Sequence, residues 1–130
     1  MHYHSINNNK DISHFLEKTN WLHDGYIIGV EYRNDGITKI DKGGYFIEPE
    51  RTRLFLRILV TSILNTVVEM EFTALTEWQI KENQWEILDT FLGFDEQGNV
   101  VWADSESTDK DELKEGSYIV AKSMRWRIAE

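Results

Sequence analysis

The sequence contains no cysteine and only one proline among its 130 residues. The lack of cysteine excludes thiolate catalysis, zinc sites built on cysteine ligands and disulfides. Three common signatures are also missing: the Gly-x-Ser-x-Gly elbow, the glycine-rich phosphate loop and the His-Glu-x-x-His helix. These missing signatures argue against an enzyme without excluding one, and the sequence assigns no catalytic residue and no cofactor.

Long apolar stretches are absent as well. No run of apolar residues approaches the ~20 residues that a membrane-spanning helix needs. The first ten residues are mostly polar and do not resemble a secretion signal. These features predict a soluble cytoplasmic protein with no membrane contact, and the length suits a single domain over residues 1–130.

Negative charge is abundant and unevenly distributed. Residues 1–60 contain eight basic and eight acidic residues, whereas residues 61–130 contain six basic and fifteen acidic residues. The second part of the chain thus accounts for the whole formal net charge of -9. An acidic surface repels phosphate backbones, so the sequence argues against nucleic-acid binding. It favours either a basic protein partner or a role of the charge in solubility alone.

Two adjoining segments show the alternation of apolar and polar residues that is typical of strands. The apolar positions are Leu54, Leu56, Ile58, Val60, Val68, Met70 and Phe72. The positions between them include Arg53, Arg57, Glu69 and Glu71. A period of two places one set on a buried face and the other on a solvated face. It predicts a pair of strands over residues 52–61 and 66–74.

The rest of the chain predicts one helix and further strands. A short helix is expected at about residues 11–19, capped by Asp11, because Ile12, Phe15 and Leu16 form one apolar stripe. The other expected strands cover residues 26–33, 37–41, 45–47, 75–83, 85–94, 99–103 and 117–128. Residues 75–83 also fit a helical turn. Residues 104–116 are expected to form a solvated acidic loop.

Turn signals separate these strands and define the fold class. Asn34-Asp35-Gly36 and Gly43-Gly44 favour tight turns, and residues 85–94 suit a central strand because apolar residues lie on both of its faces. A change of face is expected near Lys122-Ser123. The strands, between about residues 24 and 128, predict a mainly-β fold, α+β at the margin. We expect an antiparallel, strongly curved sheet, either barrel-like or a two-layer sandwich.

Aromatic side chains supply candidate binding residues. Trp78 and Trp102 have polar neighbours, so we expect both indoles to be partly exposed, whereas Trp85 and Trp126 are assigned to the core. An exposed indole can anchor a protein partner or stack on a sugar. A small-ligand or carbohydrate-binding β module is therefore an alternative function.

The dipeptide His23-Asp24 precedes the first long strand. Histidine and aspartate are metal ligands and acid–base groups, so a metal-dependent hydrolase is a further alternative. Neighbouring residues of a strand point to opposite faces, however. This favours a structural role, in which Asp24 points inward and accepts backbone N–H bonds. His2, His4 and His14 are too scattered to predict a metal site.

The order of these landmarks resembles a large group of small bacterial β-rich proteins. The likeness is carried by Leu22-His23-Asp24-Gly25-Tyr26-Ile27, by the apolar strands between residues 54 and 72, and by the closing strand, residues 118–126. Proteins of similar size, acidity and pattern include immunity proteins of bacterial toxin systems, which bind and neutralise a toxin. The resemblance implies a non-catalytic binder and assigns no role to His23-Asp24.

The leading hypothesis is a cytoplasmic binding protein, such as an immunity protein that neutralises a basic toxin. Its acidic half, including Glu69 and Glu71, would dock on the basic partner around an anchor from Trp78 or Trp102. An unpaired edge strand near residues 45–47 would also permit a homodimer.

Overall fold

Strands dominate the structure, a computed structural model that describes residues 2–40, 43–81 and 86–129. The strands are β1 (His4–Ser5), β2 (Gly25–Asn34), β3 (Ile37–Ile40), β4 (Gly44–Ile47), β5 (Thr52–Val60), β6 (Thr66–Gln79), β7 (Glu86–Ile87), β8 (Thr90–Phe94), β9 (Val100–Asp104) and β10 (Tyr118–Ile128). The helices are α1 (Asn9–Lys18) and α2 (Lys110–Leu113), with short 3-10 turns η1 (Asn20–Leu22), η2 (Pro49–Arg51) and η3 (Thr61–Ile63). The mainly-β prediction is confirmed.

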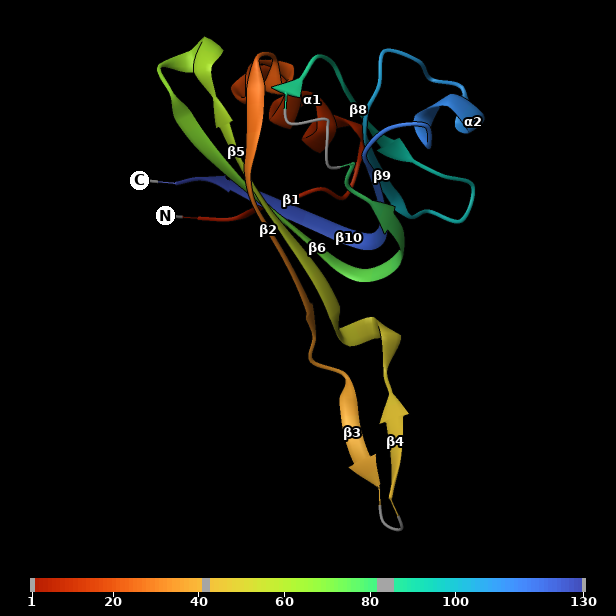
Figure 1. The fold of residues 1–130 in the computed structure, drawn as a ribbon. Helices are drawn as coiled ribbons and strands as arrows, with labels where there is room; N and C mark the ends of the chain where they lie inside the picture. The colour runs from red at the N-terminus through yellow and green to blue at the C-terminus, as the bar shows by residue number, and fades with distance from the viewer. Residues whose placement is uncertain (1, 41–42, 82–85, 130) are drawn as a thin grey trace.

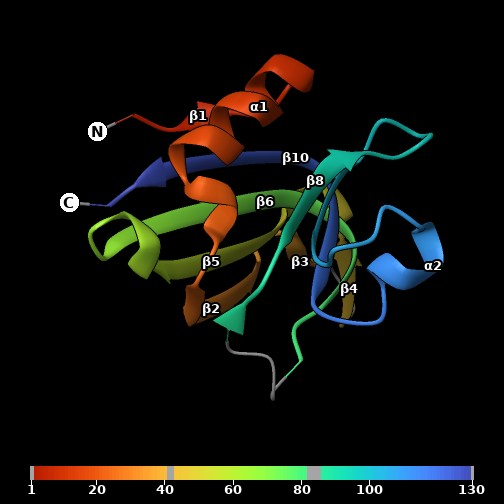
Figure 2. The same cartoon turned by 90° about the horizontal axis from the view of Figure 1, so that it is seen from above.

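Most strands form one antiparallel sheet that curves almost into a barrel. Its order is β7-β2-β5-β6-β10-β9-β8, and β1 pairs with β10. The two end strands, β7 and β8, are separated in the chain only by Leu88 and Asp89, so the ends of the sheet come close together (Figures 1 and 2). This arrangement confirms the expected curved antiparallel sheet. The helices of the described residues include none that is long and apolar enough to cross a membrane.

The core lies between this sheet and α1, which crosses one face of the sheet (Figure 2). The predicted apolar stripe of the helix is buried, and Phe15 packs edge-on against Trp126 with 5.2 Å between ring centroids. The alternating apolar residues of β5 and β6 are buried as predicted. The helix begins earlier than predicted, because its N-cap is Asn8, whose side chain accepts a hydrogen bond from the Asp11 N–H. Asp11 lies in the first turn.

A bulge changes the face of β2 along its length. The register against β5 shifts between Ile27 and Gly29, so residues that share one parity in the sequence do not share one face. Ile27 is buried. The side chains that were expected to be buried are 39–53% exposed instead: Tyr26, Ile28, Val30 and Tyr32. Beyond the bulge, Val30 and Tyr32 pair with the buried Leu56 and Leu54 and share their face, so these two side chains are exposed although they lie on the core side of the sheet. In β10 the expected change of face near Lys122-Ser123 is confirmed, because both are exposed between buried Ala121 and Met124.

Several sequence-based expectations about connections are wrong. Residues 34–36 do not form a hairpin turn, since β2 and β3 are not paired. Strand β8 lies at an end of the sheet rather than at its centre, and Leu88 before it is exposed. The loop 104–116 contains the short helix α2, whose Leu113 is buried. Strand β6 runs to Gln79, which identifies residues 75–79 as strand, while residues 82–85 lie outside the described ranges.

A separate two-stranded sheet, β3 and β4, projects from the barrel (Figure 1). It continues from the ends of β2 and β5 that lie opposite the η3 turn. We call residues 37–40 and 43–47 the arm.

Candidate functional site

A groove of about 650 Å³ lies outside the barrel core, between α2, the β8–β9 turn and β10. Two adjacent cross-strand pairs of β9 and β10 place it on the outer face of the sheet. Trp102 and Ile119 form one pair and belong to the main core, whereas the next pair, Val101 and Val120, lines the groove. Because successive residues of a strand face opposite sides, the groove and the core lie back to back.

Apolar side chains form part of the groove lining. Phe91, Phe94 and Leu113 join Val101 and Val120 there. Leu113 is buried and yet does not belong to the main core cluster, so α2 packs on a second, smaller apolar cluster. In the sequence around β8, apolar residues occupy both odd and even positions, so both faces of the strand are apolar. This signal could have located the surface.

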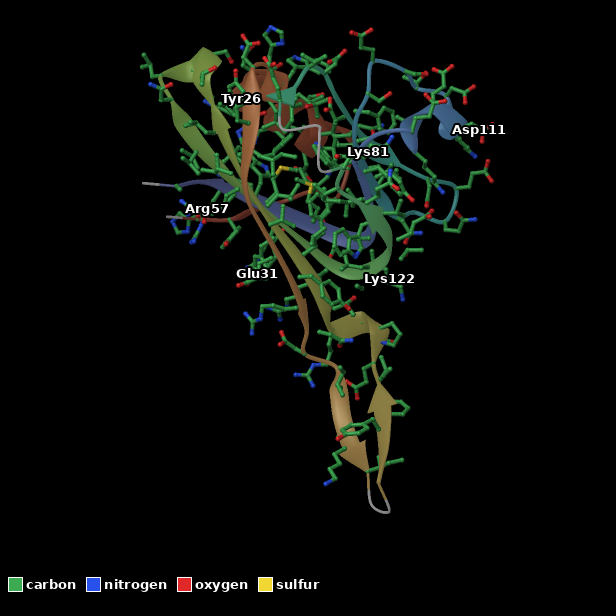
Figure 3. The ribbon with its side chains drawn as sticks, viewed as in Figure 1. Tyr26, Glu31, Arg57, Lys81, Asp111 and Lys122 are labelled. Carbon is green, nitrogen blue, oxygen red and sulfur yellow. The ribbon has the colours of Figure 1, made fainter. Side chains whose placement is uncertain are left out.

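Carboxylates surround the apolar lining. Those that line the groove itself are Glu77, Asp95, Glu96 and Asp111. We call residues 95–115 the acidic lobe; it contains eight acidic residues and only two lysines, so it accounts for six of the nine net negative charges. Figure 3 places Asp111 on the α2 side of the molecule, well separated from Arg57.

Two lysines partly neutralise the carboxylates that line the groove. Lys110 Nζ lies 2.7 Å from Glu96 Oε1, and this hydrogen bond raises the pKa of Lys110 and lowers the pKa of Glu96. Lys114 pairs with Glu77 in the same way, and the hydrogen bond raises the pKa of Lys114.

Three acidic side chains of α2 and its C-terminal flank remain exposed and available. Within the described ranges, no ion pair involves Asp111, Glu112 or Glu115. Asp111 lines the groove itself, whereas Glu112 and Glu115 do not line it and add negative charge to the solvent-exposed surface of the same segment.

The turns of the acidic lobe are built by carboxylates that have local partners. Asp95 Oδ1 accepts hydrogen bonds from the N–H groups of Gln97 and Asn99, at 3.0 and 2.8 Å, and so closes the β8–β9 turn. Burial raises the pKa of Asp95, but the hydrogen bonds from Asn99 and Gln97 outweigh it and hold this pKa below its usual value. Asp109 caps α2 by accepting from the Asp111 N–H at 2.9 Å. The lobe therefore has a defined shape.

Glu69 and Glu71, predicted as binding residues, do not lie at this groove. They lie on β6 between arginines of β5 and β10. Glu69 contacts Arg127 at 2.9 Å and Arg57 at 3.6 Å.

Glu71 has the same kind of surroundings but is far less accessible. It contacts Arg53 at 3.4 Å and also pairs with Arg125, and its side chain is only 3% exposed. Both carboxylates are thus neutralised within the chain.

The two candidate tryptophans have different surroundings. Trp102 is completely buried, so the prediction that it is partly exposed is wrong: its strand turns this side chain toward the core. Trp78 is 37% exposed, as predicted, and stacks on Tyr32 with 5.8 Å between ring centroids. Trp126 belongs to the core as predicted, and Trp85 lies outside the described residues.

His23 and Asp24 lie on the surface at the start of β2. The two side chains face each other, with His23 Nε2 3.7 Å from Asp24 Oδ2, and both are about half exposed. The prediction that Asp24 points inward is wrong, because its φ of 56° turns the backbone away from the strand geometry. Its carbonyl oxygen accepts a hydrogen bond from the Thr61 hydroxyl at 2.9 Å. The described part of the chain holds no cluster of three or more metal-ligating side chains.

Comparisons with protein-family models, curated proteins and solved structures find nothing that matches this chain.

Proposed function

We propose that this chain is a non-catalytic cytoplasmic binding protein that docks a basic protein partner at the groove of the acidic lobe. The proposal is supported by one observation above all: a groove with apolar lining is enclosed by a rim of net negative charge. Interfaces commonly combine a buried apolar anchor with a charged periphery.

The two parts of the groove have different energetic roles. Burying one large apolar side chain of a partner against Phe91 and Phe94 contributes ~1.5–3 kcal/mol. Exposed ion pairs at the rim contribute only ~0.2–1 kcal/mol each, but their summed field accelerates association. The apolar lining therefore sets the lifetime of the complex, and Asp111, Glu112 and Glu115 set the rate at which it forms.

An immunity role is the biological form of this proposal. The chain would block a basic toxin by covering its positively charged cleft with the acidic lobe. Its gene is then expected beside a toxin gene, and co-expression of the chain should restore growth to cells that produce the toxin. A charge-reduced variant, Asp111→Asn with Glu112→Gln and Glu115→Gln, should rescue growth less well.

Binding can be tested with peptide probes before the partner is known. We would measure the affinity of a Lys/Phe-containing peptide, and of a peptide in which serine replaces each phenylalanine at equal charge. We expect tighter binding of the first peptide, weaker binding in high salt, and loss of binding in the charge-reduced variant. Glu17→Gln on α1 is the matched control for the single variant Asp111→Asn, because it removes one exposed charge that does not line the groove. Equal binding of both peptides, or equal losses in Glu17→Gln, would refute the docking mechanism.

A small-ligand or carbohydrate-binding module is the second candidate. The groove volume of about 650 Å³ falls within the range of ~300–1,000 Å³ that is usual for small-ligand sites. Thermal-shift measurements against a panel of sugars would support this candidate if a sugar stabilised the wild-type chain but not Phe94→Ala.

A further inference from the structure

The arm is an exposed apolar surface that the groove does not explain. The arm extends beyond the barrel (Figure 1), and its side chains project into solvent (Figure 3). Five large apolar side chains of the arm are each 50–65% exposed: Ile37, Ile40, Tyr45, Phe46 and Ile47. A soluble chain rarely exposes so many neighbouring apolar residues unless they form an interface.

Both faces of the arm carry these side chains. In the hairpin register, Ile37 pairs with Ile47 and Lys39 pairs with Tyr45 on one face, while Phe46 lies on the other face. No other described strand pairs with β3 or β4, so each also has a free backbone edge. An isolated two-stranded sheet is only marginally stable in water, so the arm would be stabilised by a further β layer or strand.

The base of the arm is held firmly to the barrel. The Glu48 N–H donates to the Gly36 carbonyl oxygen at 2.8 Å, and the Gly36 N–H donates to the Asn34 side chain at 3.0 Å. A Cβ atom on Gly36 would collide with the Glu48 carbonyl oxygen, so this position requires glycine. The arm is therefore a built projection of the fold.

We propose that the arm binds a second copy of this chain and forms a symmetric dimer. Residues 30–53, which contain the arm and its base, carry five acidic and five basic residues, whereas the chain as a whole carries a net charge of -9. Two copies can approach through this neutral region while their acidic lobes stay apart. Free strand edges are also self-complementary, since the same edge can pair with itself about a twofold axis.

The exposed apolar area is sufficient for such a dimer when the two arms clasp each other so that both faces of each arm are covered. On the barrel, Val30 and Tyr32 of β2 and Trp78 of β6 are also 37–47% exposed, and Tyr32 stacks on Trp78. Taking ~200 Å² for each large side chain, the exposed parts sum to roughly 800 Å². A standard stable interface buries about 800 Å² on each partner. A strongly basic partner would gain little from this neutral surface, so the arm is separate from the proposed function of the groove.

Sedimentation equilibrium of the full-length chain tests the dimer. We expect a mass of twice 15.3 kDa for the wild type and a mass of 15.3 kDa for the double variant Tyr45→Ser with Phe46→Ser. Leu64→Ser is the matched control: Leu64 is 98% exposed, follows the η3 turn at the far end of β5, and should leave the dimer intact. Urea unfolding should show that the double variant keeps its barrel, because neither substituted residue belongs to the core.

Salt and cross-linking separate this dimer from other kinds of association. Because the arm is neutral and apolar, the dimer should persist in ~1 M NaCl, where charge attraction is screened beyond ~3 Å. The chain has no cysteine, so Lys39→Cys should form an intermolecular disulfide under oxidation much faster than Ser13→Cys on α1.

Three results would overturn the proposal. They are a monomeric wild type, a dimer that survives the double arm substitution, and a dimer that dissociates in high salt. The test is independent of the groove, since Asp111→Asn with Glu112→Gln is expected to impair partner binding and leave the dimer intact.

Discussion

Glu71 is almost completely buried although it lies on the outer, charged face of the sheet. Its carboxylate is 3% exposed and pairs with Arg53 and Arg125, which are 42% and 47% exposed. Removing one partner of a fully buried ion pair costs ~3–5 kcal/mol, and a hydrogen bond to a charged group is worth ~1.5–3 kcal/mol. Because water reaches both arginines after the substitution, we expect Glu71→Gln to lower the free energy of unfolding by ~2–3 kcal/mol, below the fully buried value.

Glu69 provides the matched control for this substitution. Glu69 lies two residues before Glu71 in β6, on the same face of the strand. It also contacts two arginines, Arg57 and Arg127, but its side chain is 24% exposed. Ion pairs of this kind typically contribute ~0.2–1 kcal/mol each, so Glu69→Gln, which removes two of them, should cost ~0.4–2 kcal/mol and less than Glu71→Gln. The comparison isolates burial, since the charge removed and the strand are the same.

Urea unfolding followed by tryptophan fluorescence measures both effects. The midpoint should fall much further for Glu71→Gln than for Glu69→Gln, with an unchanged slope, because the surface exposed on unfolding is the same. In ~1 M NaCl the loss for Glu69→Gln should shrink, while the loss for Glu71→Gln should largely persist. Equal losses for the two variants would show that burial of Glu71 does not strengthen its pairs, and the reasoning would be wrong.

Further substitutions test other features of the fold. Burial raises the pKa of Asp104 and outweighs the hydrogen bonds from the backbone N–H groups of Asp89 and Leu88, which lower it, so the charged form of Asp104 destabilises the fold as pH rises through that pKa. Asp104→Asn should therefore raise the urea midpoint at neutral pH, and the gain should vanish at acidic pH, where the wild-type carboxyl is protonated. Trp102→Ala should lower the free energy of unfolding by ~3–5 kcal/mol in a urea titration. Trp78→Ala should lower it clearly less, because the Trp78 side chain is partly exposed. Leu64 has a φ of 53°; by calorimetry, Leu64→Gly should be neutral or stabilising by up to ~1 kcal/mol, because glycine avoids the left-handed penalty.

The fold class could be predicted from the sequence because the core strands obey a simple period. Leu54, Leu56, Ile58 and Val60, and then Val68, Met70 and Phe72, recur at every second residue and are all buried, whereas Phe55 and Leu59 between them are only half-buried. The period fails where the backbone leaves regular geometry. The bulge after Ile27 reverses the faces of β2, and a one-residue shift of this kind leaves no clear trace in the order of apolar residues.

The candidate site was only partly predictable for a related reason. Acidic composition identified the second half of the chain, but composition cannot tell a paired carboxylate from a free one. Glu69 and Glu71 are neutralised by arginines that are 12 to 58 residues away in the sequence, so only the strand order β5-β6-β10 brings them together. Trp102 was misjudged in the same way. Its neighbour Asp104 suggests a polar environment, while the alternation of β9 turns the indole inward.

The positions of the groove and the arm allow both to act in one assembly. The arm extends from the ends of β2 and β5, whereas α2 and the β8–β9 turn lie on the barrel itself (Figure 1). A dimer formed through the neutral arms would hold two acidic lobes on separate barrels, each free to engage a partner. If a basic partner offers two sites, the second contact becomes intramolecular and the overall affinity can rise by ~10²–10⁴. The arm variant should then bind a single-site peptide as tightly as the wild type and lose affinity only for a two-site partner, which separates a role in avidity from a role in the groove.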